Sequence, residues 1–212
     1  MHEPIRVLLA DDHTIARNGV RLMLGTADDI EVAGEAADAR QALELARSER
    51  FDVALLDITM PGMNGLDLLR HLRSQVPAMA ALMLSTYSEE IYAVRALKLG
   101  AAGYLTKDVP TGVLVDAVRR AASGRRYVSP TLMDKLAALV SGDGGTAGHE
   151  SLSNRELEVL RLIARGDPLV QISERLHLSP QTVTTYRARI LEKMGMGSNA
   201  ELTRYALENG LI

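Results

Sequence analysis

Five polar residues that could do chemistry lie at the ends of short apolar runs in this sequence. They are Asp11, Asp12, Asp57, Ser85 and Lys107. Continuous apolar runs of this length are typical of strands that are buried on both faces of a parallel sheet. Open α/β sheets bind ligands at the carboxyl ends of their strands. We therefore expect the five side chains to meet at one edge of a sheet.

Three carboxylates at one sheet edge repel one another unless a hard cation lies between them. Mg²⁺ is the expected ion, because it binds carboxylates, carbonyls and water and leaves positions for phosphate oxygens. A hydroxyl and an ammonium opposite a carboxylate suit a phosphoryl group carried on Asp57, with Mg²⁺ and Lys107 stabilising charge. Simpler interpretations remain: a solvated acidic cluster, Asp57 as a turn cap, Ser85 as a turn hydroxyl and Lys107 as an ion-pair partner.

The composition is that of an ordinary globular chain. Of the 212 residues, 47% are apolar and 3% aromatic, the net charge is −3, and cysteine is absent. Disulfides, cysteine-ligated zinc and thiol catalysis are excluded. The N-terminal apolar run is too short, and too soon acidic, for a signal peptide or membrane span, so we expect a cytoplasmic protein without a membrane partner.

Strand-like and helix-like segments alternate over the first part of the chain. The strand-like runs are residues 5–10, 30–33, 53–56, 80–84 and 103–106, and the helix-length segments are residues 16–24, 39–48, 66–74, 90–99 and 111–122. Five strands that alternate with five helices predict an α/β fold, a five-stranded doubly wound parallel sheet of the flavodoxin-like kind.

A glycine-rich stretch separates this region from the rest. Ser129-Pro130 is a helix start that predicts a short helix through Val140. Residues 141–150 contain four glycines and no large apolar side chain, which is typical of a flexible linker. We expect one domain over residues 1–124, a helical and glycine-rich linker over 125–150, and a second domain over 151–212.

The last segment has only helix signals. A capping box, Ser153 to Glu156, begins the first helix. In the second helix we expect Val170, Ile172 and Leu176 to face inward. Ser179-Pro180 and Ser198-Asn199 begin the third and fourth helices, which end near Met194 and Gly210. This smaller all-α, four-helix unit is typical of a helix-turn-helix module, or less specifically of a helical interaction domain.

Residues 5–123 resemble a response-regulator receiver domain. The similarity lies in Asp11-Asp12, Asp57 with Met60-Pro61-Gly62, Ser85, and residues 100–107. It implies that Asp57 accepts phosphate from a histidine-kinase phosphohistidine. It further implies that Asp12, Asp57 and the Thr59 carbonyl contact Mg²⁺ directly, that Asp11 acts through water, and that Ser85 and Tyr104 form a switch pair. Lys107-Asp108 stands where many receivers have Lys-Pro, but Lys-Asp is usual in the subgroup named next.

The C-terminal segment resembles the LuxR-type helix-turn-helix of NarL/FixJ regulators over its whole length. The resemblance implies that Pro180–Met194 is the recognition helix in the major groove. Helix geometry puts three base-facing candidates, Thr184, Thr185 and Ala188, on one exposed face. The candidates for phosphate contact are Thr182, Arg187, Arg189 and Lys193. Residues 168–170, Thr184 and Tyr186 depart from frequent family residues.

The module is not basic, because residues 150–212 hold eight basic and eight acidic residues. Phosphate neutralisation normally supplies most of the affinity for DNA. Threonine and alanine make no bidentate contact with guanine. We therefore expect weak binding by the monomer and a strong dependence on dimerisation.

These features predict a two-component transcription regulator controlled by phosphorylation. Its expected partners are a histidine kinase, a second copy when phosphorylated, and double-stranded DNA with inverted half-sites. One alternative is a phosphate-independent DNA-binding protein that uses the receiver as a dimerisation scaffold, and another is a phosphorelay intermediate without a DNA target. A haloacid-dehalogenase-like phosphatase would need an acid two residues after Asp57, where Thr59 stands, so we expect no enzyme beyond slow self-dephosphorylation. The five histidines lack ligand spacing, and no metal is assigned to them.

Overall fold

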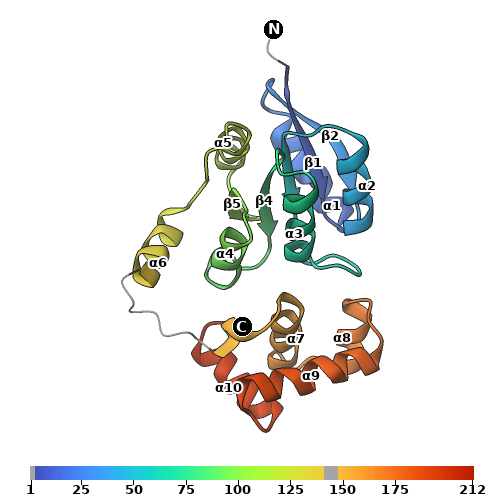
Figure 1. Ribbon diagram of the computed structural model, residues 1–212, viewed down its shortest axis with the longest axis vertical. Helices are drawn as coiled ribbons and strands as arrows, with labels where there is room; N and C mark the ends of the chain where they lie inside the picture. Colours follow the sequence, from blue (N-terminus) through green and yellow to red (C-terminus); the bar gives the residue numbers. More distant parts are fainter. Residues whose placement is uncertain (1–2, 141–147) are drawn as a thin grey trace. The chain divides into compact units, whose positions relative to one another are not determined.

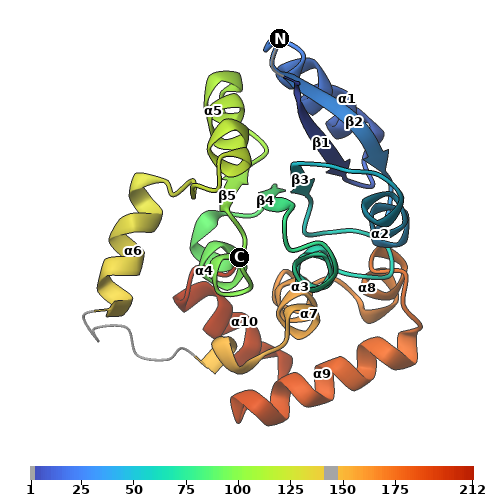
Figure 2. The same ribbon diagram turned by 45° about the horizontal axis from the view of Figure 1, so that its top comes forward.

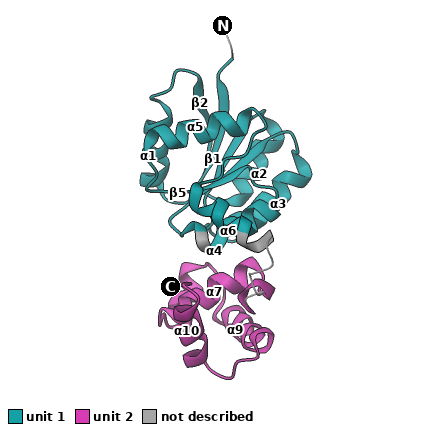
Figure 3. Ribbon diagram, turned by 90° about the vertical axis from the view of Figure 1, so that its left-hand side faces the viewer, with its two compact units in different colours: residues 1–137 teal, residues 138–212 magenta. Residues whose placement is uncertain are grey.

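The chain forms two compact units, residues 1–137 and 138–212 (Figure 3). The computed structural model describes residues 3–140 and 148–212. Residues 141–147, which make up most of the predicted glycine-rich linker, lie outside the described residues. Within the described parts no helix is long and apolar enough to cross a membrane.

The first unit contains a parallel sheet of five strands in the order β2-β1-β3-β4-β5 (Figure 1). The strands are β1 Ile5–Ala10, β2 Ile30–Ala36, β3 Val53–Leu56, β4 Ala80–Ser85 and β5 Gly103–Thr106. This order confirms the predicted flavodoxin-like fold. The strand order reverses between β1 and β3, and the ends of these two strands define the switch point where such sheets bind ligands.

Five helices alternate with the strands. They are α1 Thr14–Leu24, α2 Ala39–Ser48, α3 Gly65–Gln75, α4 Glu89–Lys98 and α5 Thr111–Ala122 (Figure 2). Alternate strand residues such as Leu9 and Leu55 form one core with Leu24 of α1 and Leu114 of α5. Helices α2 and α3 lie against the other face of the sheet (Figure 3). Both faces are therefore covered, as the continuous apolar strands predict.

The segment after α5 packs against the edge strand β5. Tyr127 N–H donates to the Ala102 carbonyl at 2.7 Å, and Tyr127 forms a parallel bridge with Gly103. Helix α6, Pro130–Val140, then begins with Ser129, whose hydroxyl accepts from Leu132 N–H at 3.1 Å. The division at residue 137 thus falls inside the 125–150 segment that the sequence predicts to be a linker.

The second unit is the predicted four-helix module. Its helices are α7 Asn154–Ala164, α8 Leu169–Arg175, α9 Pro180–Met194 and α10 Asn199–Glu208, preceded by a short 3₁₀ helix, Gly148–Ser151. The capping box at α7 is formed as predicted, with both Ser153–Glu156 hydrogen bonds present.

The prediction that Val170 faces the core of this unit is wrong. Ile172 and Leu176 are buried, but Val170 is 58% exposed. Residues four apart share a face of a helix, whereas residues two apart lie on nearly opposite faces. Val170 therefore cannot face inward together with Ile172.

Candidate functional site: an acidic cluster at the sheet switch point

The register of the sheet sets the positions of the acidic residues. Ala10 of β1 pairs with Leu56 of β3, so that Asp11 and Asp57 leave neighbouring strands at the same level. The Asp57 N–H donates to the Ala10 carbonyl at 2.9 Å, which extends the ladder by one residue. Both carboxylates therefore lie at the β1/β3 switch point, as predicted.

A lysine from the edge strand joins them. Lys107 Nζ lies 2.6 Å from Asp11 Oδ2 and 2.9 Å from Asp57 Oδ2. Asp11 and Asp57 are only 2% and 4% exposed. Single ligand atoms of Asp11, Asp12, His13 and Asp57 all lie within 4.8 Å of one another. Converging oxygens and a nitrogen at this spacing match the donor set of a divalent cation.

Burial and charge set the protonation of the central pair. Burial raises the pKa of Asp57 to about 6, and the nearby Lys107 ammonium counteracts part of this rise. Burial lowers the pKa of Lys107, but Asp57 and Asp11 more than reverse this, so the net direction is upward. Lys107 therefore stays charged, while the Asp57 carboxyl ionises at about pH 6.

A glycine allows the next helix to approach Asp57. A Cβ added to Gly65 would lie 1.8 Å from the Asp57 carbonyl oxygen. Gly65 N–H also donates to the Ile58 carbonyl at 2.8 Å, and Asn64 caps α3. The start of α3 thus packs against the backbone of Asp57 and Ile58 and holds the Asp57 side chain in position.

The predicted switch residues meet at one backbone segment. Ser85 and Tyr104 are fully buried. Tyr87 N–H donates to Ser85 Oγ at 3.3 Å, and the Tyr104 hydroxyl donates to the Tyr87 carbonyl at 2.8 Å. The Thr59 hydroxyl reaches the Tyr87 hydroxyl at 3.2 Å. Tyr87 therefore links the loop after Asp57 to both predicted switch residues, a connection that sequence reasoning did not identify.

His13 is a further member of the cluster that sequence reasoning missed. Its Nδ1 lies 2.6 Å from Asp12 Oδ1 and 3.5 Å from Asp11 Oδ1. Spacing among the five histidines gave no signal, because the partners of His13 are carboxylates. Its position directly after Asp11-Asp12 was the available signal.

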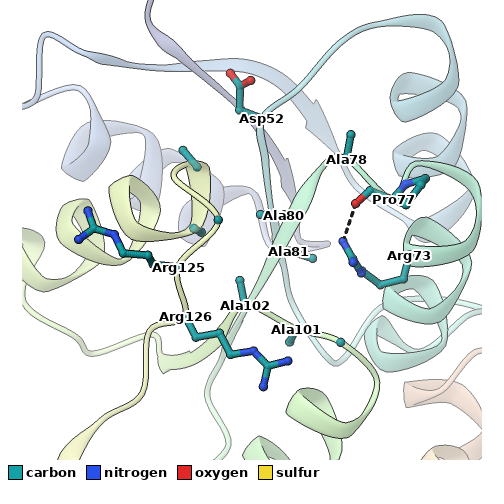
Figure 4. Close-up of a pocket in the computed structure, with 14 residues that line it drawn as sticks. Asp52, Arg73, Pro77, Ala78, Ala80, Ala81, Ala101, Ala102, Arg125 and Arg126 are labelled. Carbon is teal, nitrogen blue, oxygen red and sulfur yellow. Dashed lines mark hydrogen bonds between the residues drawn. The ribbon is translucent and has the colours of Figure 1, made fainter.

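A cavity of about 370 Å³ opens at the opposite, amino-terminal ends of β3, β4 and β5 (Figure 4). Small residues such as Ala81 and Ala102 line it, with Arg73, Arg125 and Arg126 around them. Arg73 is held by the carbonyls of Pro77 and Met79 at 2.9 and 3.2 Å. The cavity is therefore separate from the acidic cluster and lacks its carboxylates.

Helix α9 presents the base-facing candidates as predicted. Thr184, Thr185 and Ala188 are exposed. The two hydroxyls donate to carbonyls one turn back, Pro180 and Gln181, both at 3.0 Å. Each hydroxyl oxygen can still accept a hydrogen bond, and both methyl groups are available for apolar contact.

The candidates for phosphate contact differ in their freedom. Arg189 is exposed and makes no hydrogen bond or ion pair within the described residues. Arg187 Nε donates to Asn199 Oδ1 at 2.7 Å, and Thr182 is bonded to the Ser179 cap at 2.7 Å. Lys193 Nζ lies 2.6 Å from Oε2 of the buried Glu156. Arg189 is thus the candidate with no competing partner in its own unit.

Known proteins match both units. The model for "Response regulator receiver domain" matches residues 7–119, and that for "Bacterial regulatory proteins, luxR family" matches residues 150–206. The response regulator GacA of Pseudomonas aeruginosa is 36% identical over 209 residues, covering 98% of each chain.

Solved structures agree. A LuxR-family two-component response regulator from Aurantimonas sp. SI85-9A1 is 33% identical, with a TM-score of 0.61, and covers 66% of this chain and 99% of its own. RcsB from Salmonella enterica serovar Typhimurium, solved bound to the promoter rprA with the phosphomimetic BeF3−, is similar in fold. Its TM-score is 0.65 at 24% identity, covering 96% of this chain and 98% of RcsB.

Known response regulators therefore match nearly the whole chain, including both the receiver fold and the helix-turn-helix unit. The chain belongs to the NarL/FixJ family of two-component response regulators, with a receiver domain and a LuxR-type DNA-binding domain that serve in transcription regulation.

Proposed function

We propose that Asp57 is the phospho-acceptor through which a partner histidine kinase controls this regulator. The observation that carries the proposal is the position of the Asp57 carboxylate, buried at the switch point with Lys107 Nζ 2.9 Å away. A buried nucleophile beside a fixed ammonium is suited to accept a phosphoryl group, whose three oxygens together carry up to about two negative charges, without competition from water.

The transfer is a displacement at phosphorus. An oxygen of ionised Asp57 attacks the phosphorus of a phosphohistidine, the new P–O bond forms, and the P–N bond breaks. The electron pair returns to the kinase imidazole, which takes up a proton. Lys107 remains charged and stabilises the phosphoryl oxygens, while the Ile58 N–H, 2.7 Å from Asp57 Oδ1, holds the carboxylate in place.

The acidic cluster fits Mg²⁺. Asp12 Oδ1 is shielded from solvent and makes no hydrogen bond within the described residues, and the other carboxylates lie close to it. We assign Asp12, Asp57 and the Thr59 carbonyl as direct ligands and Asp11 as a ligand through water. When bound, the ion neutralises the carboxylates and polarises the phosphoryl oxygens.

The phosphoryl group is read out through Ser85 and Tyr104. The phosphoryl group on Asp57 carries nearly two negative charges, which attract the Ser85 hydroxyl. Because Ser85 Oγ accepts from Tyr87 N–H, a turn of Ser85 releases that N–H. The Tyr87 carbonyl holds Tyr104, so the same segment transmits the change to α4 and β5.

The expected result is a homodimer that places two α9 helices on inverted half-sites. Thr184, Thr185 and Ala188 then face base edges, and Thr182, Arg187, Arg189 and Lys193 lie toward phosphates. Half-sites one helical turn apart would match the spacing of two such helices.

The test labels the full chain with acetyl phosphate and Mg²⁺ and locates the phosphate by mass spectrometry. Asp57→Asn should abolish labelling, labelled dimer formation and the gain in DNA protection. Asp52→Asn is the matched control, because Asp52 lies at the other end of β3 and its Oδ2 accepts from Arg6 N–H at 2.9 Å, a bond that asparagine can keep. Equal footprints with and without phosphodonor, in wild type and Asp57→Asn, would instead favour phosphate-independent binding.

A further inference from the structure

We propose that His13 is a nitrogen ligand of the divalent cation in the acidic cluster, and that it shifts the preference of the site from Mg²⁺ toward first-row transition cations such as Mn²⁺. The inference deepens the proposed function, because it places the cation at the same site. It adds a donor atom of a different chemical kind to a set of oxygens.

The geometry of two atoms carries the inference. Asp12 Oδ1 and His13 Nδ1 lie 2.6 Å apart, yet Asp12 Oδ1 makes no hydrogen bond within the described residues. The ring N–H is therefore not aligned to donate to this oxygen. Two ligands at right angles around a cation with bonds of about 2.1 Å lie about 3 Å apart. A shift of a few tenths of an ångström brings both atoms to a shared ion.

Neither helix capping nor core packing holds the His13 ring away from the carboxylates. His13 is the N-cap residue of α1, but its side chain makes no capping hydrogen bond. The ring is 66% exposed, so no core packing holds it elsewhere. Its backbone is fixed instead, since His13 N–H donates to Asp11 Oδ1 at 2.8 Å and Arg17 donates to the Asp11 carbonyl at 2.6 Å. The loop thus presents the ring beside the carboxylates.

The remaining atoms of the cluster complete a mixed donor set. Lys107 Nζ forms ion pairs with the Oδ2 atoms of Asp11 and Asp57, so the ammonium lies on one side of these carboxylates. Asp11 Oδ1 lies 3.5 Å from His13 Nδ1. Imidazole suits iron, nickel, copper and zinc, whereas carboxylates, carbonyls and water suit Mg²⁺ and Mn²⁺ alike. Of these last two cations, Mn²⁺ accepts an imidazole nitrogen more readily, because Mg²⁺ strongly prefers oxygen donors. A nitrogen in this position therefore strengthens binding of transition cations more than binding of Mg²⁺.

The experiment measures the two cations separately on the full chain. Calorimetric titration gives the Kd for Mg²⁺ and for Mn²⁺ in wild type, His13→Ala and His71→Ala. His71 is the control, because it lies on α3 and its ring contacts the Asp67 carbonyl. Pulsed electron paramagnetic resonance of the Mn²⁺ complex reports a directly bound imidazole nitrogen by its ¹⁴N coupling. Circular dichroism verifies that the variants are folded.

We expect the ratio of the Mg²⁺ Kd to the Mn²⁺ Kd to fall about tenfold in His13→Ala, the size of effect typical for groups around a metal. The ¹⁴N coupling should be present in wild type and His71→Ala and absent in His13→Ala. An unchanged ratio, or a wild-type spectrum without this coupling, would overturn the inference and leave a simple Asp12–His13 ion pair.

Failure of the inference and failure of the proposed function have different signatures. If wild type is labelled at Asp57 by acetyl phosphate but the cation ratio does not depend on His13, the inference alone fails. If the ratio depends on His13 but Asp57 is never labelled, the phospho-acceptor role fails and the cation site stands.

Discussion

Lys107 Nζ lies between two buried carboxylates, 2.9 Å from Asp57 Oδ2 and 2.6 Å from Asp11 Oδ2. One ammonium thus balances a pair of acids that would otherwise repel each other at close range. Even so, burial keeps the pKa of Asp57 at about 6, above its ordinary value of 3.8. At neutral pH the ionised Asp57 therefore carries a negative charge that burial disfavours. A bound cation would offset this charge, and phosphorylation would replace the carboxylate with an acyl phosphate.

The first prediction concerns stability and pH in the metal-free chain. A carboxyl with a raised folded-state pKa penalises folding increasingly as pH rises from 3.8 to about 6, and the penalty is constant above that. Asp57→Asn should therefore raise the free energy of unfolding at pH 8, by up to about 3 kcal/mol for a shift of about two pKa units. The gain should shrink from pH 6 to pH 4. Urea unfolding in EDTA measures this, and a gain that is independent of pH would contradict it.

The second prediction concerns Lys107 in the transfer step. Lys107→Met removes the charge that faces Asp57, so the rate of labelling by acetyl phosphate should fall at least about tenfold, in line with the loss of one charge-stabilising group. The matched control is Lys98→Met, because Lys98 is exposed on α4. The rates are read from time courses on phosphate-affinity gels. Equal labelling rates for the two variants would show that Lys107 does not stabilise the phosphoryl group during transfer.

The third prediction concerns the contact between α3 and the Asp57 backbone. In Gly65→Ala, the new Cβ would meet the Asp57 carbonyl oxygen at 1.8 Å, so α3 or the end of β3 must move. We expect a loss of about 2–4 kcal/mol in the free energy of unfolding, as in other overpacked sites, together with slower labelling. In Gly19→Ala, nothing lies within 4 Å of the added Cβ inside α1, and stability should rise by up to about 1 kcal/mol. Equal urea midpoints for the two variants would show that the helix start can relax.

The sequence predicts those features that depend on position along the chain. Asp57 and Lys107 meet because apolar runs mark buried strands and parallel strands share one carboxyl edge. Features that depend on side-chain direction are not predictable in this way. His13 joins the cluster through its ring orientation at a helix cap, and Tyr87 contacts the predicted switch residues, Ser85 and Tyr104, through its backbone atoms. The pairing of Lys193 with Glu156 depends on how two helices pack, and it could not be predicted because the two residues lie 37 positions apart in the sequence.

The last prediction separates the basic residues of α9. Arg189 has no partner within the described residues, so Arg189→Ala should weaken binding to a random-sequence duplex and reduce the slope of log K against log salt by about 0.9. Lys193 pairs with the buried Glu156. Burial raises the pKa of Glu156, but the hydrogen bonds from Lys193 and Ser153 outweigh this and hold it below its ordinary value. Lys193→Ala should therefore change the slope less and lower the free energy of unfolding by about 1 kcal/mol. Fluorescence anisotropy over a salt series and urea unfolding provide the two readouts. If Lys193→Ala reduces the salt slope as much as Arg189→Ala and leaves the free energy of unfolding unchanged, Lys193 contacts DNA phosphates rather than stabilising the fold.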